Sequence, residues 1–271
     1  MGACRRIAVG DSHEARRQLL PDLIAGNTFA TVGISHLTTS RRHLKKPVLC
    51  AELSGDTVIL DGYSPWITGA MHADTLVVGA TLDDQREILL AVPSDAKGIT
   101  VENPARLVGL TASQTGPVRF ERTRVDRKWL LAGPVQGVMQ QGSGAKTGGL
   151  QTSTLAIGLA DAAIGYLEED VPQRPDLAPA AAALRTEWSG LRTDLLGMAE
   201  GRSVCTNEQL RSQANSLALR AAQAALSAAK GAGYVLGHPA GRWCREALFF
   251  LVWSCPQPVM EANLCELAGI A

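Results

Sequence analysis

The side chains best suited to hold a flat aromatic ligand lie in Gly62–Ala70, which reads GYSPWITGA. Trp66 offers a π-surface for stacking, and Thr68 offers a hydroxyl two residues later. The backbone N–H groups around them are suitable donors to ring nitrogens and carbonyls. On residue types alone, core packing is the commoner role for a single tryptophan. The run therefore indicates either a site for a flat heteroaromatic cofactor or a packed strand end.

Other reactive side chains form weaker patterns. The adjacent Ser35 and His36 raise the alternative of a hydrolytic triad, but Gly33-Ile34-Ser35-His36-Leu37 lacks the second glycine of a nucleophile elbow. The five histidines have no metal-ligand spacing, and the six cysteines include no Cys-x-x-Cys pair. We therefore predict no metal site, and reduced thiols in a cytoplasmic protein.

The elements that must position Trp66 are strands. Apolar alternation and turn residues predict a hairpin of 48–53 and 57–61 around Ser54-Gly55-Asp56. The same signals predict further strands at 75–80, 87–92, 99–102 and 117–121. Trp66 falls between two of these predicted strands. Ahead of them, the apolar spacing in 13–25 predicts a helix that ends at Gly26.

The second half of the chain is rich in alanine and predicts helices. The ranges are 150–167, 184–199, 207–229 and a short last helix at 261–271. The glycine-rich run before them is a linker, because Ala145 and Gln140 stand where a phosphate-binding loop ending at Lys146 requires glycine.

Length and charge narrow the function classes. At 271 residues the chain is long enough for two domains. Its formal net charge is zero, so no basic field favours nucleic acid. No apolar run reaches bilayer length, which predicts no membrane span. The first residues lack the apolar core of a signal peptide.

The run from Leu53 to Ala80 resembles the flavin-contacting segment of the acyl-CoA dehydrogenase superfamily. In that family a strand and a glycine-containing turn precede the Trp-Ile-Thr tripeptide, and an Ala-Asp pair precedes the next strand. Trp66, Ile67 and Thr68 match the tripeptide, and Ala73-Asp74 matches the pair. Aligned without a gap, Ser35 falls on the threonine that contacts the flavin pyrimidine.

Later segments extend the resemblance. The run 108–133 is similar to the last part of the family's middle domain, through Gly109, Ser113, Thr115, Phe120, Glu121, Val125 and Leu130-Leu131. The run 228–250 is similar to a Gly-Gly-x-Gly-Tyr segment of its C-terminal bundle, through Gly231, Gly233, Tyr234, Pro239, Arg242, Arg245 and Ala247.

The resemblance implies an α+β fold, with a small antiparallel β-barrel followed by an α-helical bundle. It implies a remnant N-terminal helix at 1–26, a flavin-binding middle domain at 27–133 and a helical bundle at 134–271. The implied cofactor is FAD, with FMN as the alternative. Its contacts would be Ser35, Trp66, Ile67 and Thr68.

Three departures bear on chemistry. Most of the family's N-terminal domain, which forms one wall of the acyl pocket, has no counterpart, so we expect either a shortened gene product or a companion chain that supplies this wall. In the family an arginine and a glutamine contact the adenine-diphosphate half of FAD. Arg174 is the nearest candidate for the arginine, and the glutamine aligns with Ser227. The catalytic glutamate aligns with Ser254, and its alternative place falls near Gly148.

The sequence therefore predicts a flavin-dependent oxidoreductase that acts on an acyl-CoA or related thioester, assembled as a homo-oligomer or with a companion chain. Loss of the catalytic glutamate leaves two alternatives open. One is a non-catalytic binding or oligomeric subunit. The other is a flavin monooxygenase of the dibenzothiophene monooxygenase type, which needs no base for an α-proton.

Overall fold

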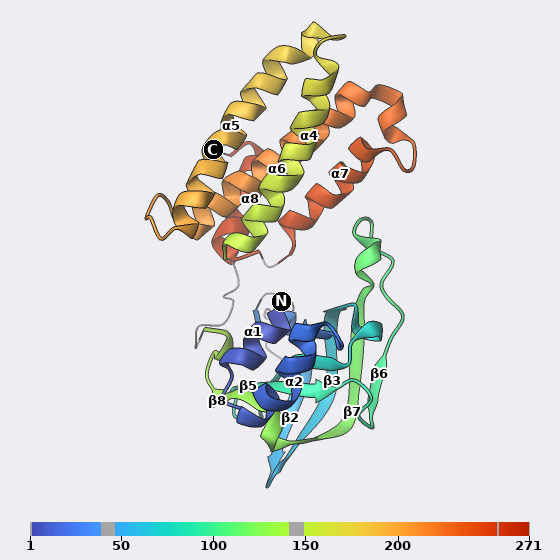
Figure 1. Cartoon of the computed structure of the whole chain (residues 1–271), viewed down its shortest axis with the longest axis vertical. Coiled ribbons are helices and arrows are strands. Elements are labelled where there is room, and N and C mark those ends of the chain that lie inside the picture. Colours follow the sequence, from blue (N-terminus) through green and yellow to red (C-terminus); the bar gives the residue numbers. More distant parts are fainter. Residues whose placement is uncertain (1, 39–46, 141–148, 254, 271) are drawn as a thin grey trace. The chain divides into compact units, whose positions relative to one another are not determined.

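The computed structural model describes residues 2–38, 47–140, 149–253 and 255–270 (Figure 1). The chain divides into two compact units, Met1–Lys146 and Thr147–Ala271. The first unit is built on a β-sheet and the second is a bundle of helices, each with its own hydrophobic core. This confirms the predicted α+β class, a sheet followed by a helical bundle.

The described residues of the sheet unit form eight strands. They are β1 (Ala30–Gly33), β2 (Leu49–Ser54), β3 (Thr57–Thr68), β4 (Thr75–Thr81), β5 (Glu87–Pro93), β6 (Ile99–Val101), β7 (Thr115–Asp126) and β8 (Leu130–Val135). The order is β6-β7-β3-β2-β4-β5-β8, with β1 paired to β4. The sheet is open at β6 and β8, and its β1–β4 and β2–β4 pairs are parallel. The expected all-antiparallel barrel is thus an open, mixed sheet.

Two strands are longer than predicted. β3 continues past residue 61 to Thr68, and β7 runs on to Asp126, because the two strands pair along nearly their whole length. Trp66 therefore lies inside β3 rather than between strands. Proline and the polar residues of this stretch mask its strand character in the sequence, and the long-range pairing with β7 supplies it.

The β2–β3 hairpin forms as the sequence predicts. Ser54 pairs with Thr57 across Gly55-Asp56, and Gly55 takes the positive φ of 58° that this tight turn requires. The alternating apolar side chains of the strands fill a core that includes Leu49, Leu60, Leu76, Ile88 and Phe120. Burial of this face fixes the strand register.

The helices α1 (Gly2–Val9) and α2 (His13–Ala25) pack on the sheet unit (Figure 1). The hydroxyl of Ser12 caps α2 by accepting from the Ala15 N–H at 2.9 Å, and Gly26 ends it at a φ of 77°. The helix predicted over 13–25 is α2.

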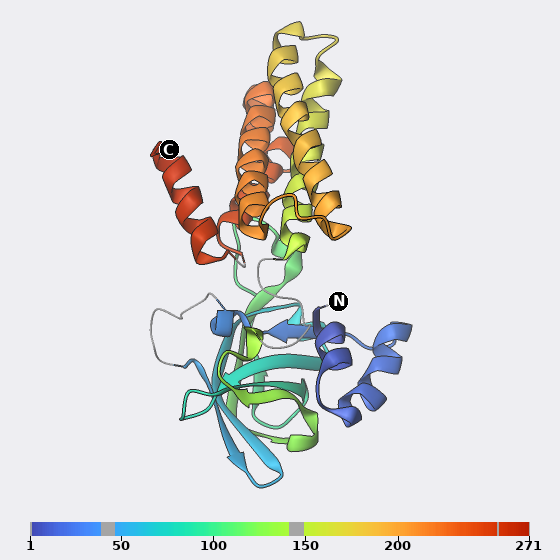
Figure 2. The ribbon, with the colours of Figure 1, turned by 90° about the vertical axis from the view of Figure 1, so that its left-hand side faces the viewer.

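The helical unit contains α4 (Leu150–Asp170), α5 (Ala178–Ala199), α6 (Asn207–Ala229), α7 (Pro239–Ala247) and α8 (Gln257–Ala268). Buried alanines on α4 and α6 let the helices approach closely; they include Ala156, Ala160, Ala163, Ala214, Ala218, Ala221 and Ala225. Figure 2 shows α8 at the edge of this bundle. Across the described ranges, no helix is long and apolar enough to cross a membrane.

Candidate functional site

A β-bulge presents Trp66. Ser64 pairs with Val118 and Ile67 with Gly116, so β3 has one more residue than β7 between these pairs. Pro65 has no N–H to give to the ladder, which suits it to such a bulge. The Ile67 side chain is fully buried, whereas Trp66 is 45% exposed. The bulge therefore turns an aromatic face outward on a rigid strand.

β1 lies against this end of β3. The Thr31 hydroxyl donates to the Thr68 carbonyl at 2.7 Å. A Cβ on Gly33 would lie 2.5 Å from Ile67 Cδ1 and 2.7 Å from Ser64 Oγ, closer than real Cβ contacts allow. Gly33 is thus required for the two segments to approach.

The Ala73-Asp74 pair has a physical role here. The Asp74 carboxylate accepts from the Phe29 N–H at 2.7 Å, and the Asp74 N–H donates to the Phe29 carbonyl at 2.8 Å. These two bonds tie the start of β4 to the residue before β1. The Phe29 ring also lies beside Gly69, which directly follows Thr68.

Three hydroxyls form a chain beside Trp66. The Thr68 and Thr115 hydroxyl oxygens are 2.9 Å apart, and the Thr115 and Ser113 hydroxyl oxygens are also 2.9 Å apart. Thr68 and Thr115 are direct cross-strand partners of β3 and β7. The sequence predicted Thr68 as a polar contact but missed its hydroxyl partners, since strand register leaves no local signal.

Ser35 and His36 begin the short helix α3 (Ser35–Thr38). The Ser35 Oγ atom is buried and has no hydrogen-bond partner among the described residues. His36 Nε2 lies 2.9 Å from the Gly79 carbonyl, so Nε2 donates and Nδ1 keeps its lone pair. Burial lowers the pKa of His36 to about 4, so the ring is neutral at pH 7. Ser35 and His36 therefore do not form the hydrogen-bonded pair of a hydrolase.

These residues fit the ring half of a flavin. α3 packs against β3, which brings Ser35 to the same strand as Trp66 and Thr68. An unsatisfied buried hydroxyl, an open indole face and a hydroxyl at a strand end are the groups that a heteroaromatic ring with acceptor atoms uses. No hydrogen bond among the described residues joins Ser35 to Thr68.

A cavity of about 230 Å³ lies elsewhere in the sheet unit. It is lined by residues of α2, β4 and β5 and their loops: Gln18, Leu19, Asp22, Thr28, Asp74, Thr75, Ala91, Pro93 and Trp129. None of the predicted site residues lines this cavity. We therefore build the candidate site on the end of β3.

In the helical unit, Ser254 lies outside the described residues. The segment before it is held by Arg211, which is 1% exposed on α6. Arg211 donates to the carbonyls of Phe250 and Trp253 at 3.1 and 3.0 Å, and to the Asn215 side chain at 2.8 Å. Desolvation by burial lowers the pKa of Arg211. The sequence did not predict this clamp.

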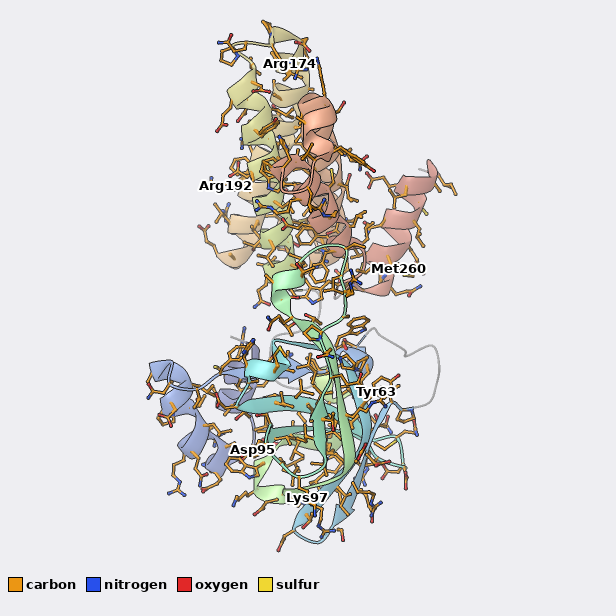
Figure 3. All side chains as sticks on the ribbon, turned by 90° about the vertical axis from the view of Figure 1, so that its right-hand side faces the viewer. Tyr63, Asp95, Lys97, Arg174, Arg192 and Met260 are labelled. Carbon is orange, nitrogen blue, oxygen red and sulfur yellow. The ribbon has the colours of Figure 1, made fainter. Side chains whose placement is uncertain are left out.

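Arg174, the candidate contact to a cofactor adenine, lies where α4 passes into α5 (Figure 3). Its guanidinium donates to the Ala228 carbonyl at 2.6 Å and lies 3.7 Å from Asp176. This bond joins the connection between α4 and α5 to the C-terminal end of α6, in the same unit. His238, by contrast, caps α7 by accepting from the Ala240 N–H at 3.2 Å.

The cysteines and acids form no metal site within the part of the chain that is described. None of the six cysteines, all of which are described, forms a disulfide. On β7, Arg119 is ion-paired with Glu102, and the Arg122 guanidinium lies 3.4 Å from the Glu52 carboxylate.

No protein-family profile matches the chain. A probable acyl-CoA dehydrogenase, YngJ of Bacillus subtilis (strain 168), is 32% identical over 125 residues, covering 43% of this chain and 33% of that protein. A mitochondrial short-chain specific acyl-CoA dehydrogenase of Rattus norvegicus is 28% identical over 216 residues, covering 73% of this chain and 52% of its own length. The chain thus spans between a third and about half of these relatives.

Solved structures show the same fold. An acyl-CoA dehydrogenase from Geobacillus kaustophilus matches with a TM-score of 0.81 at 22% identity, covering 97% of this chain and 74% of that chain. Butyryl-CoA dehydrogenase from Megasphaera elsdenii matches with a TM-score of 0.81 at 18% identity, covering 98% and 75%. These structural likenesses and the sequence relatives agree with the matched tripeptide at β3. The chain is thus similar in sequence to acyl-CoA dehydrogenases over part of its length, and it shares their fold.

Proposed function

We propose that the protein is a flavin-dependent oxidoreductase that acts on an acyl-CoA or a related acyl thioester. The observation that carries this proposal is the end of β3, where Trp66 is exposed on a bulge, Ile67 is buried and Thr68 carries a partnered hydroxyl. Its relatives are acyl-CoA dehydrogenases. A bound flavin supplies hydride acceptance, and the protein must hold the ring and move the substrate proton.

In this proposal Trp66 is the wall of the ring site, Ser35 and Thr68 are its polar contacts, and Ile67 anchors the strand beneath. FAD is the proposed cofactor. FMN is the alternative, because the internal bonds of Arg174 to Ala228 and Asp176 occupy the side chain nearest in sequence to the family's adenine contact. A cofactor held mainly by its ring would bind in either form.

The proton-removing group is the weakest part of the family chemistry in this chain. Ser254 stands where the family has glutamate, and a serine hydroxyl does not ionise near neutral pH. Two acids nearby in sequence have other partners: Glu246 lies 3.7 Å from Arg242, and Glu261 accepts from the Gln257 side chain at 2.9 Å. A positioned base contributes about 10²–10⁴-fold to proton abstraction, so we expect slow dehydrogenation.

Anaerobic mixing of the flavin-loaded protein with a panel of saturated acyl-CoAs tests the proposal. We expect the flavin to stay largely oxidised in the wild type. In Ser254→Glu, which restores a carboxylate at that place, we expect measurable bleaching. Rapid reduction in the wild type would show that another acid is the base. Reduction only by an added flavin reductase would instead favour the monooxygenase alternative.

We also propose that the protein is a homo-oligomer. On α8, Met260, Leu264 and Leu267 follow one another at helical spacing and are 36%, 58% and 63% exposed (Figure 3 labels Met260). Soluble proteins seldom leave such an apolar stripe uncovered. Light scattering should give a mass of two or more chains at micromolar protein. A stable monomer there would contradict this part of the proposal.

A further inference from the structure

The hydroxyls of Thr68, Thr115 and Ser113 form a hydrogen-bonded chain, and its geometry does not fix which oxygen of each pair is the donor. Each hydroxyl donates one hydrogen and accepts up to two. Thr68, Thr115 and Ser113 are joined by two hydrogen bonds, in which either oxygen can be the donor. Two bonds use two of the three hydrogens. One hydrogen is therefore left over: on Thr68 or on Ser113 when the bonds run in one direction, and on Thr115 when it accepts from both neighbours.

The backbone around this chain is held in an uncommon conformation. Leu110 and Gln114 both have positive φ, 58° and 46°, on either side of the turn Thr111–Ser113. Residues other than glycine adopt such angles when their surroundings impose them, and these residues gather at functional sites. Here the turn sets where the Ser113 and Thr115 hydroxyls lie.

Contacts from the end of β3 fix the turn. The Gly69 N–H donates to the carbonyls of Ser113 and Gln114 at 3.0 and 3.2 Å. The His72 Nε2 atom lies 2.5 Å from the Gln114 side-chain oxygen. The segment that follows Thr68 thus holds the same turn that supplies its hydroxyl partner. This is a preorganised arrangement rather than a chance pair of surface threonines.

We propose that Ser113 and Thr115 are positioning residues that orient the Thr68 hydroxyl toward a ligand stacked on Trp66. The inference rests on the proposed flavin function. A ligand atom that only accepts selects the order in which Ser113 donates to Thr115 and Thr115 to Thr68. A ligand N–H that donates to the Thr68 oxygen is compatible with the reverse order, in which Thr68 donates to Thr115 and Thr115 to Ser113. Rotation of three hydroxyls changes one order into the other, so the chain serves both an unprotonated and a protonated ring nitrogen.

The proposal predicts a loss of ligand affinity that acts through Thr68. Thr115→Val keeps the shape of the side chain and removes the hydroxyl, so it should weaken FAD binding about three- to tenfold, the usual worth of one hydrogen bond. Ser113→Ala, one bond further away, should weaken it about two- to threefold. Thr115→Ser keeps a hydroxyl and should restore most of the affinity. Thr100→Val, an exposed threonine on β6, is the matched control.

A double-mutant cycle separates positioning from a structural role. The affinities of wild type, Thr68→Val, Thr115→Val and the double variant for FAD are measured by fluorescence titration of the full chain. If Thr115 acts through Thr68, the double variant binds no more weakly than Thr68→Val alone. Losses that simply add would overturn the proposal, as would a Thr115→Val protein with wild-type affinity.

The visible absorption spectrum of the bound flavin gives a second readout. Loss of the Thr68 orientation should shift its main band in Thr115→Val and Ser113→Ala and leave it unchanged in Thr100→Val. If Thr115→Val does not fold, Ser113→Ala and Thr115→Ser carry the test by themselves, and unchanged binding in Ser113→Ala then overturns the proposal. A wild type that binds neither FAD nor FMN would overturn the proposed function itself, and this inference with it.

Discussion

The two units of the chain differ in how their buried polar side chains are bonded. In the sheet unit, the Ser35 hydroxyl and His36 Nδ1 are buried with no hydrogen-bond partner among the described residues, and Trp66 is 45% exposed. In the helical unit, the buried Arg211 donates to two carbonyls and an amide, and its Nη1 atom alone has no partner among the described residues. Unsatisfied buried groups cost stability unless a water or ligand completes them. The difference fits the proposal that the sheet unit receives a ligand, whereas the hydrogen bonds of Arg211 stay within the bundle.

Arg185 illustrates the second half of this contrast. It bonds Asp161 and Glu168 of α4 from its place on α5, and its guanidinium lies 4.6 Å from the Trp188 ring centre. These bonds raise the pKa of Arg185, and they lower the pKa of Glu168. All of its partners belong to the bundle, so the side chain joins two helices and needs no ligand.

Of the substitutions that test this comparison, Arg211→Ala is expected to lower the free energy of unfolding most. It would leave the Trp253 carbonyl and the Asn215 side-chain oxygen without this donor, and the Phe250 carbonyl with the Asn215 amide alone. Leaving a buried acceptor unsatisfied costs about 1–3 kcal/mol, and we expect a loss of that order or somewhat more in the free energy of unfolding. Urea titration followed by circular dichroism measures it. Arg192→Ala, an exposed arginine on α5, is the control and should change stability far less.

The second prediction concerns His36 in the sheet unit. Its pKa is lowered by burial to about 4 in the folded protein, from the ordinary histidine value of 6.5. The unfolded chain therefore binds the proton more tightly, and stability is full above pH 6.5 and falls as the pH drops toward 4. The loss reaches at most about 3 kcal/mol.

His36→Gln removes this titration and keeps a donor suited to the Gly79 carbonyl. Urea midpoints between pH 7 and pH 4.5 should therefore fall less steeply in the variant than in the wild type. Equal slopes in the two proteins would show that His36 is not buried as a neutral ring.

The smallest of the three effects is expected at Arg185. Its side chain and those of its partners are partly exposed, so solvent screening reduces the worth of its ion pairs. With the Trp188 contact included, Arg185→Ala should lower the free energy of unfolding by about 1 kcal/mol. The difference from wild type should shrink in high salt. A loss of stability as large as that of Arg211→Ala would contradict the expected difference between a partly exposed arginine and a buried one.

Local signals predicted much of this fold. Gly26 ends α2, Gly55 marks the β2–β3 turn, and the α6 helix begins and ends at its predicted residues. Each of these depends on a few neighbouring residues, so a single sequence carries them. The lengths of β3 and β7 depend on pairing between distant segments, and were underestimated for that reason.

The candidate site divides in the same way. Trp66 and Thr68 were predicted because they stand in one recognisable run. The partnership of Thr68 with Thr115 depends on register across 47 residues, and the Arg211 clamp joins α6 to a segment 39 residues away. Neither has a sequence signal without knowledge of the fold. Ser254 lies outside the described residues, and its alignment with the family glutamate stays a prediction.

The central claim is that the exposed face of Trp66 receives a flavin ring, and an equilibrium titration tests it most directly. The full-length wild type and its Trp66→Ala and Trp66→Phe variants are titrated with FAD and with FMN, with Trp188→Phe in the bundle as the control. The account predicts binding by the wild type, roughly tenfold or greater weakening in Trp66→Ala through loss of stacking, and near-complete retention in Trp66→Phe. Trp188→Phe should bind as the wild type does. A wild type that leaves the fluorescence of both flavins unchanged, or a Trp66→Ala protein that binds them equally well, would contradict it.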